Sequence, residues 1–393
     1  MNIIFVQQDK DLWGAPRSLL ALILYLREHG HKCKVLLHGD CPFRLELDKN
    51  AVENEVVPRR TWTYLENDKF ARRTASGFYS FSANFFAAGQ AMKSVCRFEP
   101  DLIHTNSSKT NFGAILAWRM GIPHVWHFRE FIGGEFSSGL VFSLGDRFSR
   151  KFIEISSSAA IVISKALKKH LALCDTRISV HMIYNGVMPL DMMKKTSITP
   201  LPNSKTLILA WIGRFNAYKH PIVAMEALKI LKDKKCPVKL VVAGTGREDQ
   251  VKQLEQYISV HKLEDAVEMC GFVEDISEVY AKSHVMVMTS TADAFGRVTS
   301  EAMAYGRPVI GADSCATSEL IEHGIDGLLF RPNDPKDLAD KILQLYENRD
   351  LIVRLGANAA EKAKREFTIE KYGSRMEQIF YSVINRNENT EIE

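Results

Sequence analysis

The fold is decided at the start of the chain, where residues 2–39 read NIIFVQQDKDLWGAPRSLLALILYLREHGHKCKVLLHG. A short apolar run is followed by a longer run with apolar residues at helical spacing and then by a second short apolar run, which predicts strand, helix and strand. Further runs of strand length follow at DLIHTN (101–106), HVWHF (124–128) and AAIVIS (159–164). Strands that alternate with helices predict an α/β fold with a parallel, doubly wound sheet.

The same alternation begins again at TLILAWIG (206–213) and continues to RPVIGAD (307–313). A chain of 393 residues also exceeds what one hydrophobic core usually supports. We therefore expect two Rossmann-like domains, residues 1–190 and 206–367, which face each other across a cleft. Residues 191–205 are expected to be the linker, and an amphipathic helix at about 368–393 is expected to pack back on the first domain.

Composition sets limits on the class of protein. Hydrophobic residues make up 46% of the chain and charged residues 25%, which is typical of a globular protein and excludes a largely disordered one. The seven cysteines form no CxxC pair, so neither a zinc ribbon nor a disulfide framework is indicated. The apolar start of the chain is too short for a signal peptide, and no run approaches the ~20 apolar residues of a membrane-spanning helix. We expect a cytoplasmic protein.

The positive charge is concentrated in the first half. Residues 1–200 hold 26 Lys and Arg against 18 Asp and Glu, whereas the remainder holds 25 against 29. This asymmetry suggests an anionic partner for the first half, such as a phospholipid surface, although a solvated basic face explains it equally well. No nucleic-acid-binding module is recognisable, so no nucleic-acid partner is expected.

One segment, residues 59–86, combines arginines with aromatic side chains. Such a mixture suits an anionic membrane interface, and we predict peripheral docking there, with burial of the rings in the core as the alternative. Its four arginines and eight aromatic residues are Arg59, Arg60, Arg72, Arg73, Trp62, Tyr64, Phe70, Phe78, Tyr79, Phe81, Phe85 and Phe86.

Glycines and cations follow two strands of the second half. Gly213 ends the first of these strands and is followed by Arg214 and Lys219, and Gly244 and Gly246 follow the next. Glycine permits a sharp turn and a close approach of the backbone to an anion, which the two cations would bind. An ordinary turn between strand and helix is the alternative.

Residues 291–306 read TADAFGRVTSEAMAYG and place two carboxylates, Asp293 and Glu301, on either side of a Phe-Gly turn. An acid/base pair, a metal site and a sugar-nucleotide site are all open on this spacing. The turn begins a helix, and the free amides near Arg297 and Val298, with roughly half a unit of positive charge from the helix dipole, would bind a phosphate.

Five motifs of the second half, taken in order, resemble the donor half of the retaining, nucleotide-sugar-dependent GT-B glycosyltransferases of glycosyltransferase family four (glycosyl transferases group 1). The first half resembles this family more loosely, through WGAPRSL, PDLIHTN, WHFRE and IYNGV. The five motifs are GRFNAYKH, VVAGTG, GFVED, DAFGRVTSEAMAYGRPVI and GIDGLLF.

The resemblance implies a role for each candidate. Asp293, which stands where the family has Glu, would meet hydroxyls of the donor sugar, and Glu301 would accept the ribose diol. Arg214 and Lys219 would bind the diphosphate, and His127 would position the reacting centre by hydrogen bonding. The expected catalytic set is therefore His127, Arg214, Lys219 and Asp293.

The remaining donor-binding positions are expected to act through close backbone approach, helix amides or the base pocket. They are Gly14, Gly213, Gly244, Phe272, Phe295, Gly296, Arg297 and Val298.

The resemblance also implies the reaction, which is retaining transfer of a hexose from a UDP- or GDP-sugar to a saccharide or lipid-linked acceptor in bacterial surface polysaccharide or glycolipid synthesis. Two fixed cations and a helix N-terminus can stabilise the leaving diphosphate, so we expect no metal and no cofactor beyond the nucleotide sugar. A sugar-nucleotide epimerase of the same fold and a non-catalytic binding module, to which Asp293 lends weight, are the alternatives.

Overall fold

The computed structural model describes residues 1–11, 14–66, 70–133, 139–171, 178–196 and 201–390. Trp13 of the first loop and parts of three expected segments therefore lie outside the described residues. Those parts are 67–69 of the basic aromatic segment, 197–200 of the linker and 391–393 of the terminal helix.

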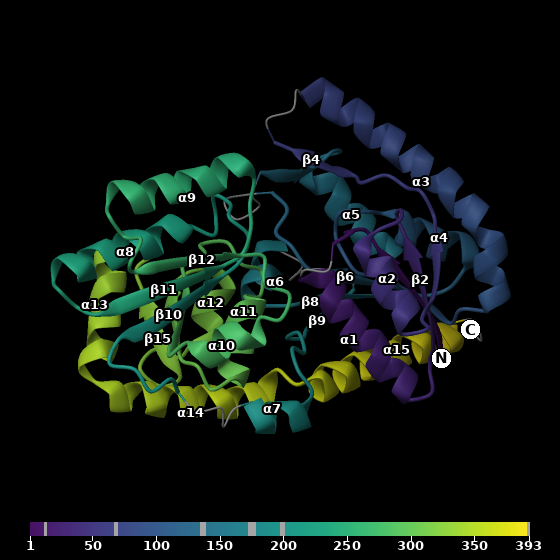
Figure 1. Cartoon of the computed structure of the whole chain (residues 1–393). Helices are drawn as coiled ribbons and strands as arrows, with labels where there is room; N and C mark the ends of the chain where they lie inside the picture. The colour runs from purple at the N-terminus through teal and green to yellow at the C-terminus, as the bar shows by residue number, and fades with distance from the viewer. Residues whose placement is uncertain (12–13, 67–69, 134–138, 172–177, 197–200, 391–393) are drawn as a thin grey trace. The chain divides into compact units, whose positions relative to one another are not determined.

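The chain divides into two compact units (Figure 1), unit 1 with residues 1–186 and 369–393 and unit 2 with residues 187–368. Each contains a parallel sheet flanked by helices, which confirms the α/β fold with two Rossmann-like sheets. The boundaries differ from the expected ones, because the segment 191–205 does not form a simple linker. It begins within helix α7 (Leu190–Thr196), whose fully buried Met193 packs with unit 2 and whose Thr196 hydroxyl donates to the carbonyl of Ala304 at 3.0 Å.

The main sheet of unit 1 has the strand order β3-β2-β1-β5-β6-β8-β9, with every neighbouring pair parallel. Strands β4 (Thr63–Leu65) and β7 (Leu140–Phe142) form a separate, two-stranded antiparallel sheet. The strands of the main sheet are β1 (Asn2–Gln7), β2 (Lys32–Leu37), β3 (Glu53–Val56), β5 (Leu102–Thr105), β6 (His124–Phe128), β8 (Ala159–Val162) and β9 (Ser179–Met182).

Side chains of β1 alternate between the two faces of this sheet, as the period of a strand requires. Ile3 and Phe5 pack with the helices α1 and α15, whereas Ile4 and Val6 pack with α3 and α4 (Figure 1). The helices of unit 1 are α1 (Ala15–Glu28), α2 (Pro42–Lys49), α3 (Phe70–Phe98), α4 (Phe112–Met120), α5 (Asp146–Ser156), α6 (Lys165–Leu171) and α15 (Ile369–Thr390).

The sheet of unit 2 has the strand order β12-β11-β10-β13-β14-β15 and is parallel throughout. Its strands are β10 (Leu207–Ile212), β11 (Val238–Ala243), β12 (Val267–Gly271), β13 (Val285–Met288), β14 (Val309–Ala312) and β15 (Gly327–Phe330). Besides α7, its helices are α8 (Pro221–Asp233), α9 (Glu248–Val260), α10 (Ser277–Lys282), α11 (Arg297–Ala304), α12 (Cys315–Leu320), α13 (Pro335–Glu347) and α14 (Arg349–Glu366).

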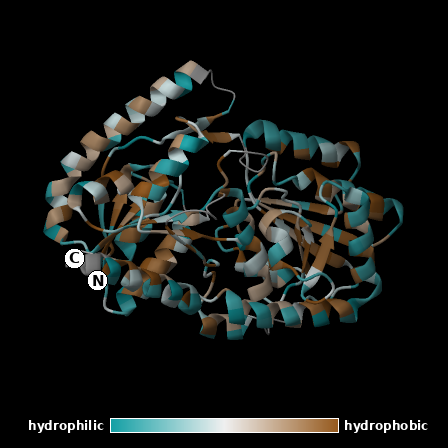
Figure 2. Cartoon of the chain, turned by 180° about the vertical axis from the view of Figure 1, so that it is seen from behind, coloured by the Kyte–Doolittle hydropathy of each residue, from teal (hydrophilic) through white to brown (hydrophobic). Residues whose placement is uncertain are grey.

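The strands of both sheets are predominantly apolar and the helices carry polar outer faces (Figure 2), which is the pattern of sheets buried on both sides. Among the described residues, no helix is long and apolar enough to cross a membrane. In the sheet of unit 2, β10 lies between β11 and β13, so the ends of these three strands are adjacent. Ligands of open α/β sheets bind at such carboxyl ends, where the chain order switches direction.

Candidate functional site

Two glycines bring the ends of β10 and β11 into close contact. The amide of Gly213 donates to the carbonyl of Ala243 at 3.0 Å, and the amide of Gly244 donates to Gly271 at 2.7 Å. A Cβ atom at Gly244 would lie 1.8 Å from the carbonyl oxygen of Gly213, so no larger residue fits there without a shift of the backbone. The predicted importance of Gly244 thus has a structural reason within the protein itself, which applies whether or not a ligand is bound.

The loop after β10 is hydrogen-bonded to the loop after β13. The hydroxyl of Thr289 donates to the carbonyl of Lys219 at 2.7 Å, and the amide of Thr291 donates to the carbonyl of Tyr218 at 3.0 Å. Asn216 accepts the amide of Lys219 at 3.0 Å. These bonds fix the backbone of Lys219 beside the segment that carries the first carboxylate.

Lys219 and Asp293 form an ion pair. The Lys219 Nζ atom donates to both carboxylate oxygens of Asp293 at 2.7 Å, and the two side chains are 17% and 15% exposed. The predicted diphosphate cation and the predicted sugar-binding carboxylate are therefore brought together, although they are 74 residues apart. Each neutralises the other, and a ligand that binds either group competes with its partner.

Glu301 is the fifth of the eight residues of α11 and is held by Arg297 and by Tyr280. The Nε atom of Arg297 donates to its Oε1 atom at 2.7 Å, and the hydroxyl of Tyr280 donates to its Oε2 atom at 3.2 Å. An ionised carboxylate has about four lone-pair positions, so both oxygens can still accept further hydrogen bonds. Gly296 begins the helix with φ +75°, a conformation that glycine adopts readily. The first turn of the helix, at Arg297 and Val298, carries the positive end of the helix dipole, which favours an anion.

The other predicted donor-binding residues of unit 2 differ in exposure. Arg214 is exposed directly after Gly213, and the ring of Phe272 is 59% exposed after β12. The ring of Phe295, in contrast, is buried and meets Phe367 edge-on at 6.0 Å between centroids. The side chain of Phe295 therefore serves the packing of unit 2, and what remains available for binding at this position is the backbone.

His127 lies in β6 of unit 1 and is 0% exposed. Its Nδ1 atom lies 3.1 Å from the Nε2 atom of His104, and its Nε2 atom has no hydrogen-bond partner within the described residues. Burial, the cation Arg129 and the neighbouring His104 hold the pKa of His127 well below its usual value, so the ring is neutral at physiological pH. A buried ring nitrogen without a partner is costly, which makes it a candidate for contact with a bound polar group.

Gly14 precedes α1 with φ +52°, and no atom lies within 4 Å of the position that its Cβ would occupy. The carboxylate of Glu130 is partly buried and accepts from the hydroxyl of Ser107 at 2.7 Å and the amide of Ser108 at 2.8 Å. Burial raises the pKa of Glu130. Arg129 donates to Asn185 and, at 2.9 Å, to the hydroxyl of Tyr372, so its guanidinium is committed to the interior of unit 1.

Sequence reasoning missed two residues that organise the site of unit 2. Tyr280 lies in the short helix α10, outside every motif, and reaches Glu301 because its ring stacks on Tyr305 at 5.0 Å. Cys315 follows β14 with φ +49°, and its thiol donates to the carbonyl of Thr291 at 3.2 Å. Within the part of the chain that the structure describes, no group of three His, Cys, Asp or Glu side chains is placed to hold a metal ion.

Family models match both halves of the chain. Residues 14–189 match the model described as Glycosyltransferase Family 4, and residues 194–362 match the model described as Glycosyl transferases group 1. The chain belongs to this glycosyltransferase family. The resemblance read from the motifs is confirmed.

A solved structure shares its fold with the chain. The structure of Anabaena Alr3699/HepE in complex with UDP and glucose is 25% identical, with a TM-score of 0.78 over 97% of this chain and 100% of that one. The GT-B architecture is thereby confirmed for this glycosyltransferase.

Two curated relatives show the range of the family. The chain is 32% identical over 186 residues to the N-acetyl-alpha-D-glucosaminyl L-malate synthase of Bacillus anthracis, an alignment that spans 47% of this chain and about half (48%) of that enzyme. It is 26% identical over 332 residues to the N,N'-diacetylbacillosaminyl-diphospho-undecaprenol alpha-1,3-N-acetylgalactosaminyltransferase of Campylobacter jejuni, covering 78% of this chain and 85% of that one.

Proposed function

We propose that this glycosyltransferase moves a hexose-type sugar from a UDP- or GDP-sugar to a saccharide or lipid-linked acceptor, with retention of configuration and without a metal ion. The observation that carries the proposal is the grouping of Lys219, Asp293 and the first turn of α11 at the ends of β10 and β13. A cation, a carboxylate and a helix N-terminus are groups that suit a nucleoside diphosphate and a sugar hydroxyl.

In this proposal the donor diphosphate binds Lys219, the exposed Arg214 and the amides of Arg297 and Val298. When the diphosphate takes Lys219, the carboxylate of Asp293 loses its partner and accepts a hydroxyl of the donor sugar. Glu301, already oriented by its two protein contacts, accepts the ribose diol. The exposed ring of Phe272 lies next to the expected base pocket. Arg214 and Lys219 supply the charge that a metal ion supplies in other sugar-nucleotide enzymes.

Retention, which the family resemblance implies, is proposed to proceed through the following bond changes. The acceptor hydroxyl oxygen bonds to the anomeric carbon on the face from which the diphosphate departs, and the bond between the anomeric carbon and the phosphate oxygen breaks with its electron pair on the diphosphate. The leaving phosphate oxygen takes the proton of the acceptor hydroxyl. Fixed cations at the diphosphate stabilise the negative charge that develops there, and no protein nucleophile is needed.

His127 is proposed to hydrogen-bond to the transferred sugar through its Nε2 atom. Support comes from the neutral state of the ring and from the absence of a partner for that atom among the described residues. A neutral imidazole can donate or accept at this atom, and it adds no charge beside the departing diphosphate. Gly14 at the start of α1 provides a second place where the backbone can approach the donor closely.

The donor and acceptor classes are supported by the relatives. One relative's structure holds UDP and glucose, and the name of another specifies an undecaprenyl diphosphate acceptor. On this basis we propose a role in bacterial surface polysaccharide or glycolipid synthesis at the inner face of the cytoplasmic membrane.

The test is a reaction of the purified chain with α-linked UDP- or GDP-hexoses and a short-chain polyprenyl-diphosphate sugar, in the presence of EDTA. We expect one donor to yield an α-linked product, seen by nuclear magnetic resonance of the new anomeric proton. A β-linked product would contradict retention, and a reaction that stops in EDTA would contradict metal independence. An isomerised nucleotide sugar formed without acceptor would instead identify an epimerase.

A further inference from the structure

Helix α3 (Phe70–Phe98) carries an unusual combination of charge and apolar surface. None of its 29 residues is acidic, and its four charged residues, Arg72, Arg73, Lys93 and Arg97, lie towards its two ends. A surface helix of this length normally mixes charges of both signs on its outer face. The charge of this helix is therefore wholly positive, which suits an anionic partner.

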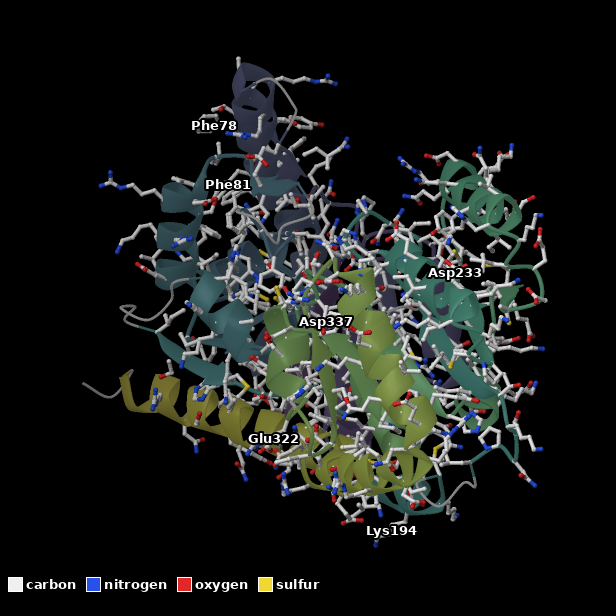
Figure 3. All side chains as sticks on the ribbon, turned by 90° about the vertical axis from the view of Figure 1, so that its left-hand side faces the viewer. Phe78, Phe81, Lys194, Asp233, Glu322 and Asp337 are labelled. Carbon is white, nitrogen blue, oxygen red and sulfur yellow. The ribbon has the colours of Figure 1, made fainter. Side chains whose placement is uncertain are left out.

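The inner face of α3 is accounted for by the core of unit 1. Ala88, Ala91 and Val95 are buried against the sheet, and Phe81 meets Phe152 of α5 edge-on at 5.2 Å between centroids. The outer face is exposed and aromatic. Phe78, Tyr79 and Phe86 are 63%, 59% and 73% exposed, and their spacing of seven to eight residues places them on one side of the helix (Figure 3 labels Phe78 and Phe81).

The exposed aromatic surface continues onto the neighbouring helix α4. Trp118 of α4 is 71% exposed, and its ring lies 6.4 Å from that of Phe85. The guanidinium of Arg119 lies 4.4 Å from the centre of the Phe85 ring. We call this surface the aromatic face; it consists of Phe78, Tyr79, Phe85, Phe86 and Trp118. Contiguous exposed apolar surface of this kind marks an interaction site in soluble proteins.

Charge decides between the possible occupants. Arg72 lies one to two turns before the aromatic residues of α3, Lys93 and Arg97 follow them by two to three turns, and Arg119 lies beside them. If the aromatic face met a second copy of itself about a two-fold axis, these cations would meet cations, which is unfavourable. An anionic bilayer suits both kinds of side chain. The rings can enter the headgroup layer, and the Lys and Arg side chains can extend to its phosphates.

We propose that the aromatic face is a membrane-binding surface that lies in the headgroup region of an anionic bilayer, with α3 parallel to the membrane plane. The surface differs from the one expected at residues 59–86, because Arg59 and Trp62 are buried and because Trp118 and Arg119 belong to α4. Lipid binding does not require the donor site. An experiment can therefore contradict membrane binding and leave the proposed glycosyl transfer intact, or contradict glycosyl transfer and leave membrane binding intact.

The experiment is co-sedimentation of the full chain with vesicles of phosphatidylcholine, with and without phosphatidylglycerol, at low and high salt. We expect binding that requires the anionic lipid and weakens with salt. The double variant Phe78→Ser/Phe86→Ser should bind about tenfold or more weakly, since it removes two rings from the interface. Lys93→Glu/Arg97→Glu should bind anionic vesicles several-fold more weakly.

The matched control is Val260→Ser/Val353→Ser, which removes two similarly exposed apolar side chains from α9 and α14 of unit 2. It should bind vesicles as the unchanged protein does. All variants alter exposed side chains, and their thermal midpoints report whether they fold. No binding to anionic vesicles at low salt, or equal losses in the control, would overturn the proposal. So would a concentration-dependent dimer in sedimentation velocity that Phe78→Ser/Phe86→Ser abolishes.

Discussion

Lys219 and Asp293 of unit 2 are partly exposed and paired with each other, whereas the candidate histidine of unit 1 is fully buried and neutral. Lys219 and Asp293 are on loops, and a ligand that brings an anion to Lys219 can replace the carboxylate as its partner. His127 is fixed by its strand and by His104. In the proposed reaction, unit 2 supplies exchangeable charges for the diphosphate, while unit 1 supplies a rigid hydrogen-bonding position.

The largest expected effect concerns the two partners of the ion pair. Lys219→Ala should weaken binding of UDP or GDP, or slow turnover, by about tenfold to over a hundredfold, since a charge-assisted hydrogen bond contributes about 1.5–3 kcal/mol. Asp293→Asn should bind the free nucleoside diphosphate at least as tightly as the unchanged protein, because Lys219 loses its competitor, yet should turn over more slowly.

Calorimetry and steady-state rates of these two variants test the pairing, and Lys282→Ala on the exposed surface of α10 is the control. If Asp293→Asn weakens diphosphate binding as much as Lys219→Ala does, the two side chains form a structural pair rather than exchangeable partners.

The second prediction concerns Glu301, whose carboxylate is held by protein groups on both oxygens. Glu301→Gln should weaken nucleotide binding by about tenfold and should reduce the preference for a ribonucleotide over its 2′-deoxy analogue, since the charged acceptor of the diol is lost. Competition assays with both nucleotides measure this, with Glu278→Gln on α10 as the control. An unchanged preference for the ribonucleotide would remove Glu301 from the ribose site.

The third prediction uses the buried histidines of unit 1. Burial depresses the pKa of His104 and of His127 well below the usual value, and that of His124 to about 3. In the unfolded chain these histidines take up protons at about pH 6.5, whereas in the folded chain they stay neutral. The free energy of unfolding is therefore highest above that pH. It falls as the pH drops further, by about 1.4 kcal/mol per pH unit for each histidine.

Hydrogen exchange of β5 and β6 between about pH 7.5 and 5.5 should show this loss, which spans the ordinary titration range of histidine. The variant His104→Gln/His127→Gln should show a shallower dependence. A protection that does not change with pH would mean that the rings are accessible to protons in the folded state.

The smallest expected effect is that of Tyr280→Phe. It removes the 3.2 Å hydrogen bond to Glu301 without touching the ligand, so nucleotide affinity should fall only roughly two- to tenfold. The preference for a ribonucleotide over its 2′-deoxy analogue should decrease, as it should for Glu301→Gln. If Tyr280→Phe has an effect as large as Glu301→Gln, the tyrosine itself touches the nucleotide.

The strands, the glycine turns and the helix that starts at Arg297 could be predicted from the sequence, because each depends on residues that are close together in the chain. The pairing of Lys219 with Asp293 could not, since it requires β10 and β13 to be neighbours, and strand order is a property of the whole sheet. Tyr280 was missed for the same reason. Helix α7 falls in the segment expected to be the linker, because its single buried methionine gives too weak a periodic signal to predict a helix.

The most direct test of the account is calorimetric titration of UDP and GDP, in EDTA, into the unchanged protein and into Lys219→Ala. We predict saturable binding of one nucleoside diphosphate by the unchanged protein, which EDTA leaves intact and Lys219→Ala weakens by tenfold or more. If neither nucleotide binds the folded protein in EDTA, or if Lys219→Ala binds as tightly as the unchanged protein, the donor site described at the ends of β10 and β13 is contradicted.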